Sequence, residues 1–181
     1  MTIILEAAMR PERPPLSGLK DSATVAAIVC AEEWEVRERF FIADVTFLID
    51  GIDLSRSAEA LIDFGMSLRS SLDELAMSGT SELQFQGTPS RIKFALTGAD
   101  VHVSANFAEG EAICPYIELY RAVLVFVRDA LDAVTRAAPE ILKNDFIEYL
   151  YRTYAVREKG NDQFMRHGRV VADSDSRPEG A

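Results

Sequence analysis

Residues 94–120 of the chain read FALTGADVHVSANFAEGEAICPYIELY, and this stretch decides the fold. Apolar and polar residues alternate on both sides of a turn at Gly98–Asp100, which is the pattern of a β-hairpin with one buried face. Pro115 stands where the first turn of a helix accepts a proline, so we expect a long helix from Tyr116 to about Ala137. The same 27 residues contain four acidic side chains and no Lys or Arg. The stretch therefore predicts a hairpin, a helix and an acidic surface together.

Upstream of this stretch, two segments are candidates for strands. In Phe40–Asp50 the apolar residues recur at every second position, and a turn pair follows at Asp50 and Gly51. The residues that share the apolar face are Phe41, Ala43, Val45, Phe47 and Ile49. Thr24–Cys30 is short, rich in β-branched residues and apolar on both faces, which suits a buried strand. So short a run also fits a helix, and periodicity does not choose between the two.

Helices are predicted between and after the strands. The first runs from an N-cap at Ser55 or Ser57 to about Met77, and Gly79 ends it. Its apolar residues recur at spacings of three and four: Leu61, Phe64, Leu68, Leu72 and Leu75. After the long helix, Pro139 interrupts the chain, and Ile141–Tyr154 is predicted to form a last amphipathic helix.

The predicted order of elements is strand, strand, helix, three strands, helix and helix. This order predicts the α+β class, with an antiparallel sheet of about five strands and two or three long helices packed on one face. Residues 1–20, which contain the proline-rich run Arg10–Pro15, are expected to form an N-terminal arm. Residues 21–156 are expected to form a single α+β domain. Residues 157–181, rich in Gly, Asp, Ser and Arg, are expected to form a disordered tail.

The chain is acidic, with 19 basic and 29 acidic residues in 181, a net charge of −10 and a pI near 4.7. Because phosphate neutralisation dominates nucleic-acid affinity, a binder of nucleic acid would need a basic surface, and we expect no such partner. The longest apolar run, Ala23–Ala31, is far shorter than the ~20 residues that a membrane span needs. The N-terminus lacks the basic region of a signal peptide. We therefore expect no membrane partner and a cytoplasmic location.

Two groups of residues are predicted to bind a partner. Local acidity without compensating bases favours a surface directed at something basic. The first group is the acidic patch of the opening stretch: Asp100, Glu109, Glu111 and Glu118. The second surrounds the only tryptophan: Glu32, Glu33 and Trp34. A tryptophan with carboxylates around it fits an interface anchor, and the favoured interpretation is a charged hairpin linker with Trp34 folded onto the core.

The alternative function is a small enzyme or metal-dependent hydrolase that uses His102 with Asp100 or Cys114. Asp100 and His102 leave a strand on the same face, and with Glu109 or Glu111 they would offer ligands to a divalent cation. The favoured interpretation is the solvated side of a hairpin. Cys114, at a helix start, would have a lowered pKa and could pair with His102 as base. No third group and no oxyanion-hole glycines accompany the pair, so a capping or buried thiol is favoured.

Specific catalytic and cofactor motifs are absent from the sequence. It contains no phosphate-binding glycine loop, no Gly-x-Ser-x-Gly and no His-Glu-x-x-His. Cys30 and Cys114 make no metal or redox spacing. We therefore expect a non-enzymatic binding protein without a cofactor or bound metal. A homodimer through the tyrosines of the last helix is a third hypothesis, in which the contact residues are Tyr149, Tyr151 and Tyr154.

Residues 61–94 carry a recognisable pattern. It reads Leu-x2-Phe-x3-Leu-x3-Leu-x2-Leu, then a short link at Gly79, then Ser81-Glu82-Leu83-Gln84-Phe85 and Ile92-Lys93-Phe94. With the hairpin and helix that follow, the pattern resembles the small acidic immunity proteins that accompany bacterial wall-associated polymorphic toxins, over roughly residues 40–135. The chain departs from that family after Phe85, where Gln86-Gly87-Thr88-Pro89 keeps only the proline of an acidic Glu-Pro. The resemblance implies a cytoplasmic, non-catalytic inhibitor whose partner is a basic toxin domain.

Overall fold

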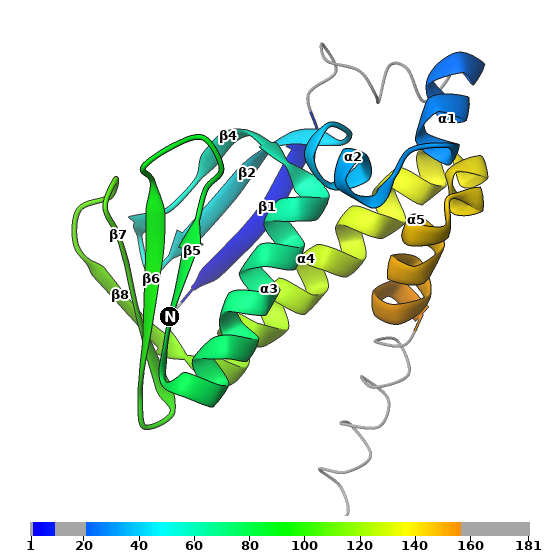
Figure 1. The fold of residues 1–181 in the computed structure, drawn as a ribbon. Helices are drawn as coiled ribbons and strands as arrows, with labels where there is room; N and C mark the ends of the chain where they lie inside the picture. The colour runs from blue at the N-terminus through cyan, green and yellow to red at the C-terminus, as the bar shows by residue number, and fades with distance from the viewer. Residues whose placement is uncertain (1, 10–20, 157–181) are drawn as a thin grey trace, which may run out of the picture.

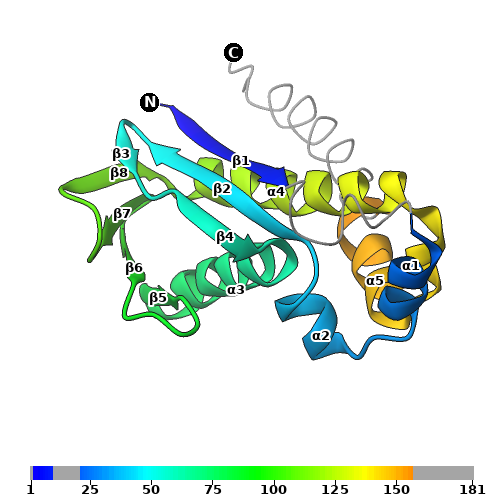
Figure 2. The ribbon, with the colours of Figure 1, turned by 90° about the horizontal axis from the view of Figure 1, so that it is seen from above.

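The computed structural model describes residues 2–9 and 21–156, so the Arg10–Pro15 run and the expected tail 157–181 lie outside the described residues. Within the described part, the chain forms two antiparallel sheets of four strands each together with helices, which confirms the α+β class. Figures 1 and 2 show the strands toward one end of the molecule, with α3 (Leu61–Ser78) and α4 (Tyr116–Ala137) packed beside them. The short helices α1 (Ser22–Val29) and α5 (Asp145–Leu150) lie at the opposite end.

The first sheet, called sheet A, is built around one central strand. Its members are β1 (Ile3–Met9), β2 (Ile42–Ile49), β3 (Ile52–Asp53) and β4 (Arg56–Ala60). Strand β2 pairs with β1 along one edge and with β3 and β4 in turn along the other. The predicted strand Phe40–Asp50 is confirmed, because β2 and the residue before it bury every member of the apolar face.

The second sheet, called sheet B, follows the order of the chain. It contains β5 (Thr80–Gln84), β6 (Arg91–Thr97), β7 (Asp100–Ala105) and β8 (Glu111–Pro115), each paired with the next. The predicted hairpin is confirmed, with Gly98 at a left-handed φ of 64° in its turn. Strand β8 was not predicted, and it adds a second hairpin whose turn contains Gly110 at φ 91°.

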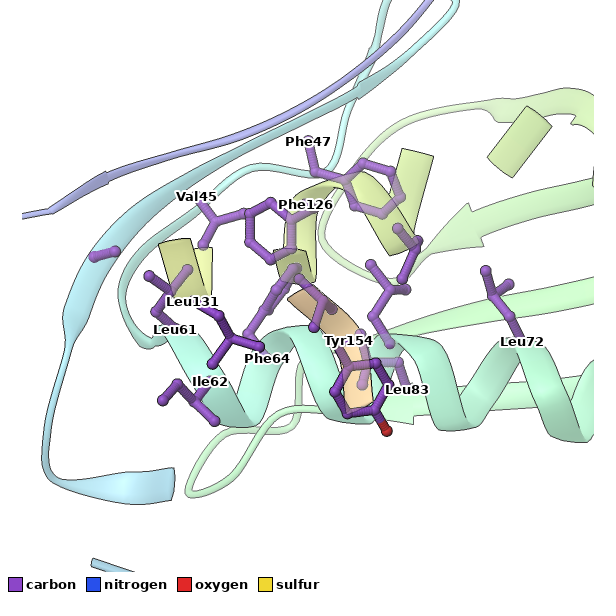
Figure 3. Close-up of a cluster of buried hydrophobic side chains, with 14 of the residues drawn as sticks. Val45, Phe47, Leu61, Ile62, Phe64, Leu72, Leu83, Phe126, Leu131 and Tyr154 are labelled. Atoms are coloured by element: carbon purple, nitrogen blue, oxygen red, sulfur yellow. The ribbon is translucent and has the colours of Figure 1, made fainter. Parts of the chain in front are cut away.

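The main core lies between β2 and the two long helices. Figure 3 shows Val45 and Phe47 of β2 directed toward Phe64 of α3 and Phe126 of α4. The rings of Phe64 and Phe126 meet edge to face with centroids 5.8 Å apart. The helices approach closely at Gly65, where an added Cβ would lie 3.1 Å from a methyl group of Val127. The predicted stripe of α3 is confirmed, since all five of its apolar residues are buried.

The opposite end of the domain is closed by short helices held by one buried amide. Besides α1 and α5 it contains α2 (Glu33–Glu38), the 3₁₀-helix η2 (Pro139–Lys143) and the π-helical turn η3 (Tyr151–Val156). Asn144 caps α5, where its side-chain oxygen accepts the N–H groups of Phe146 and Ile147. Its amide nitrogen donates to the carbonyl oxygens of Ile28 and Ala31 at 2.9 and 2.8 Å. One side chain therefore joins α1 to α5.

In the first half of the chain, the structure decides one alternative that the sequence left open and shows that one prediction is wrong. Thr24–Val29 is helical, within α1, with Cys30 as the C-cap, and the Asp21 carboxylate caps this helix by accepting the backbone N–H of Thr24. Of α1 only Ile28 is buried, so the run is not a buried strand. The helix expected to begin at Ser55 or Ser57 begins at Leu61 instead, because residues 56–60 pair with β2 as β4. Ser55 accepts the backbone N–H of Phe47 rather than capping a helix.

The structure also corrects the predicted number of strands and the predicted length of the last helix. The strands of the described residues number eight in two sheets, against about five expected in one sheet. The last helix, expected over Ile141–Tyr154, is divided into η2, α5 and η3. The division falls at Asn144, whose extended backbone and side-chain cap begin a new helix there. By contrast, the bounds of α4 match the predicted helix from Tyr116 to Ala137.

Candidate binding surface

Carboxylates from both sheets meet at the strand end of the domain. The turn between β2 and β3 lies against the turn between β7 and β8, where an added Cβ on Gly110 would be 3.0 Å from the Ile52 side chain. We call the resulting exposed surface the acidic rim, and it consists of Asp50, Asp53, Glu109 and Glu111. Sequence analysis named Glu109 and Glu111 and missed Asp50 and Asp53. Asp100 does not belong to the rim, because it pairs with Pro115 at the other end of the β7–β8 hairpin from Glu111, which pairs with Ser104.

The acidic rim is poorly neutralised. Among the residues that the structure describes, Lys and Arg make no ion pair with Asp53 or Glu109. Hydrogen bonds from the Ser55 side chain and backbone hold the pKa of Asp53 below its usual value, so this carboxylate stays charged to lower pH. Beside the rim, His102 Nδ1 lies 3.2 Å from Glu111 Oε2.

Apolar side chains stand exposed next to these carboxylates. Ile113 of β8 is 50% exposed and lies on the outer face of sheet B, opposite His102 in the strand register. Ile117, at the start of α4, is 47% exposed. An apolar centre surrounded by charged residues is the composition of a protein–protein interface.

Glu118 does not belong to the acidic rim. It lies in the first turn of α4, where its carboxylate is 3.1 Å from Arg121, and it lines a groove between β1 and α4. The exposed arginine neutralises part of its charge. The predicted patch is thus divided: Glu109 and Glu111 share the rim, Asp100 lies at the other end of the β7–β8 hairpin, and Glu118 faces a separate groove.

The second predicted cluster lies on α2, apart from the rim, and its charges are largely compensated. Trp34 is 45% exposed, so it is not folded into the core. Its indole N–H donates to Glu32, and the Arg39 guanidinium lies over its ring at 4.5 Å. Glu33 faces Arg37 at 3.7 Å. The cluster presents an exposed aromatic ring within a local network of ion pairs rather than a surface of one charge.

The geometry does not assemble the alternative catalytic pair. Val101 is opposite Cys114 and His102 is opposite Ile113, so the Cys114 side chain faces the core while His102 faces outward. Burial, together with the charges of Asp100 and Asp50, raises the pKa of the Cys114 thiol to about 11. The interpretation as a buried thiol is the one that the structure fits. Within residues 2–9 and 21–156, no group of three or more side chains is placed to hold a metal ion.

The three tyrosines of the dimer hypothesis do not share an exposed face. Tyr149 is 60% exposed, whereas Tyr154 is 8% exposed and packs under the Arg69 guanidinium at 4.6 Å. Arg69 comes from α3, so its contact with Tyr154 packs the last described helical turn against α3. Its ring is not available to a second copy.

Comparison with known proteins adds no function to this geometry. No protein-family model, curated protein or solved structure matches the chain. None of the helices in the described ranges is long and apolar enough to cross a membrane.

Proposed function

We propose that the protein is a non-enzymatic binding protein that uses its acidic rim to bind a basic protein partner. The observation that carries the proposal is the meeting of two hairpins, one from each sheet, which gathers the four exposed carboxylates of the rim on the sheet that exposes Ile113. Complementary charge speeds the encounter between two proteins and selects partners of opposite sign. The apolar side chain supplies the area that a stable contact buries.

A toxin domain is the partner class that we favour. The pattern of residues 61–94 resembles that of immunity proteins, which bind and inhibit a cognate toxin. A basic toxin domain would present to the rim the charge that the rim lacks. In this proposal Glu109 and Glu111 form the primary contact, and Trp34 with Glu32 and Glu33 offers a second contact on α2.

The test is binding of a lysine-rich peptide that contains one leucine, followed by NMR on isotope-labelled protein. We expect the largest shift changes at the backbone amides of Asp53, Glu109, Glu111 and Ile113. Affinity should fall as salt rises to physiological strength, where the Debye length is about 8 Å. The double variant Glu109→Lys/Glu111→Lys should weaken binding about tenfold or more, because it reverses the local potential.

The control carries the same change of net charge elsewhere. Glu74→Lys/Glu140→Lys alters two exposed residues on α3 and η2, away from the rim. If this control loses as much affinity as the rim variant, the peptide senses only the total charge and the proposal fails. Binding that does not change with salt would contradict it as well.

A further inference from the structure

The outer edge of β1 is open along its length. Within the described residues, β1 pairs only with β2, and no strand lies on its other side. Its sequence, Ile-Ile-Leu-Glu-Ala-Ala-Met, has one charged residue and no proline. Edge strands in other proteins are commonly protected by charges, prolines or bulges, because an open edge pairs with any strand that reaches it. This edge has little of that protection.

The hydrogen-bond pattern shows which backbone groups face the open side. The backbone N–H of Phe47 donates to Ser55 Oγ at 3.1 Å, and its carbonyl oxygen accepts the N–H of Leu54 at 2.8 Å. Both groups of Phe47 therefore point away from β1, and its partner Leu5 belongs to a pair without mutual hydrogen bonds. The N–H and C=O of Leu5 thus point outward. By the alternation of an antiparallel ladder, those of Ile3, Ala7 and Met9 do so too.

A groove lies beside this edge, over α4. One part, of about 400 Å³, is lined by Ile3–Glu6 and by Glu118, Arg121, Ala122 and Val125. A second part, of about 300 Å³, continues along Leu5–Ala7 and Met9 and reaches Asp129, Ala130 and Ala133. Figure 2 shows β1 lying along α4, so the groove follows the strand. Its floor on α4 bears small apolar side chains.

We infer that this groove takes an extended segment of the basic partner, which adds to sheet A as a fifth strand at the edge of β1. The inference rests on the proposed function, because it assigns the segment to the same basic partner. Outward N–H and C=O groups spaced every second residue are satisfied by another strand, as in β-augmentation. Alternate side chains of the segment would point down onto α4, and the others would emerge beside Glu6.

The charge of the groove favours a basic partner over a second copy of the chain. Its lining carries three carboxylates, Glu6, Glu118 and Asp129, and one guanidinium, Arg121. Arg121 pairs with Glu118 at 3.1 Å and Arg128 with Asp129 at 3.0 Å, so the local excess of negative charge is at Glu6. Two copies paired about a two-fold axis would bring these carboxylates together, and like charges facing each other across strands are destabilising. A strand with apolar residues toward α4 and lysine or arginine beside Glu6 fits both the apolar floor of the groove and its negative charge.

The experiment uses two labelled peptides of alternating residues, valine–lysine and valine–glutamate, with the full chain. Hydrogen exchange measured by NMR should show that the Leu5 and Ala7 amides exchange rapidly in the free protein and become protected when the valine–lysine peptide binds. The valine–glutamate peptide should bind at least about tenfold more weakly.

The matched variants are Ala7→Pro and Ala7→Ser. Proline removes an outward N–H while leaving the hydrogen bonds between β1 and β2, and edge strands tolerate it at such a position. We expect Ala7→Pro to lower the affinity for the valine–lysine peptide about tenfold, whereas Ala7→Ser, which keeps the N–H, should leave it nearly unchanged. Glu6→Lys should reverse the preference between the two peptides.

Each outcome separates this inference from the proposed function. Protection of Leu5 and Ala7 in the free protein, or a dimer that forms as concentration rises, would show that the edge is already occupied and would overturn the inference. If the rim amides respond to the peptide while the Leu5 and Ala7 amides stay unprotected, the inference falls and the proposed function stands. If neither region responds, both fall.

Discussion

The two sheets have the same number of strands, but they differ in which residues adopt left-handed backbone. Sheet B makes its three tight connections with Gly87, Gly98 and Gly110, each at a left-handed φ between 64° and 91°. Sheet A has Gly51 at 90° in one turn, but it also places left-handed backbone on residues with side chains: Phe41 at 60°, Asp50 at 49° and Ala58 at 59°. A left-handed conformation costs an L-residue roughly 1–2 kcal/mol, and glycine avoids that cost. Sheet B is therefore relaxed at its turns, and sheet A is strained.

The residues of sheet A with left-handed backbone are kept in that conformation by their contacts with neighbouring residues. The ladder between β2 and β4 is interrupted by a bulge between Ala43 and Val45, and Ala58 lies opposite this irregularity. The Asp44 carboxylate accepts the backbone N–H of Ala58 at 3.0 Å, which fixes the bend. Strained residues persist where their surroundings impose them. This difference indicates that the conformation of sheet B is determined by its own turns, whereas that of sheet A is determined by the core against which it packs.

The largest expected effect comes from removing that core. Phe47→Ala takes a fully buried ring from β2, and large-to-small changes of this kind cost about 3–5 kcal/mol of unfolding free energy. Urea unfolding followed by circular dichroism and by Trp34 fluorescence measures the loss. The two signals should change together, because both sheets share one core.

Phe94→Ala in β6 is the matched control in sheet B, since Phe94 is 1% exposed. It should also destabilise in a single transition. Two separate transitions in either variant would mean that the sheets unfold independently, and the contrast drawn between them would then describe two units rather than one.

A smaller effect is expected where the two sheets touch. Gly110→Ala must place a side chain at φ 91° and within 3.0 Å of Ile52, whereas Gly98→Ala meets open space at φ 64°. Each change costs roughly 1–2 kcal/mol for the left-handed backbone, and Gly110→Ala should cost about 1 kcal/mol more for the overlap. Thermal unfolding of the two variants gives the difference. Equal losses would show that Ile52 moves aside freely.

A modest gain is expected where sheet A is strained. Ala58→Gly relieves the left-handed cost but adds conformational entropy to the unfolded chain, so the net stabilisation should be about 0.5–1 kcal/mol. Chemical denaturation measures it. The companion variant Asp44→Asn keeps a side-chain oxygen for the N–H of Ala58 and should not reproduce the gain. A loss of stability in Ala58→Gly would remove the argument that sheet A is strained there.

The smallest effect at neutral pH concerns Cys114, which lies where both sheets meet. Its pKa of about 11 in the folded protein exceeds the ordinary value of 9.0. Between these values the unfolded thiol loses its proton while the folded thiol keeps it, so stability is complete below pH 9 and is lost as pH rises toward 11. Cys114→Ala should show a shallower decline of stability over that window. Identical slopes in the two proteins would contradict the assignment.

Sequence patterns predict sheet B and α4 well because their information is local. Glycine turns join adjacent strands, and Pro115 precedes a helix whose stripe is complete. Local sequence patterns do not predict sheet A in the same way. β1 pairs with residues far along the chain, and β4 exists only because Arg56–Ala60 completes the edge of β2 across a bulge. Tertiary pairing thus overrides the serines that resemble helix caps.

The candidate site shows the same limit. Glu109 and Glu111 are found from sequence because they stand close together in an acidic stretch, whereas Asp100 of the same stretch lies at the other end of β7. Asp50 and Asp53 join the two glutamates only through the contact between Ile52 and Gly110, which no local pattern reveals. Glu118 is adjacent in sequence, but the helix carries it to the groove beside β1. The rim as a binding surface stays a prediction.

The position of β1 has a consequence for the order in which the protein assembles. Ile3 pairs with Ile49 and Met9 with Ala43, so β1 is synthesised before its partner β2 and cannot pair along its full length until residue 49 has left the ribosome. Until then the apolar residues of β1 are exposed beside a growing chain. Closing so long a segment is slow compared with forming the hairpins of sheet B. β1 is thus synthesised before β2 and pairs with it late. Between these two events, a chaperone or an unpaired strand of another chain has its best access to β1.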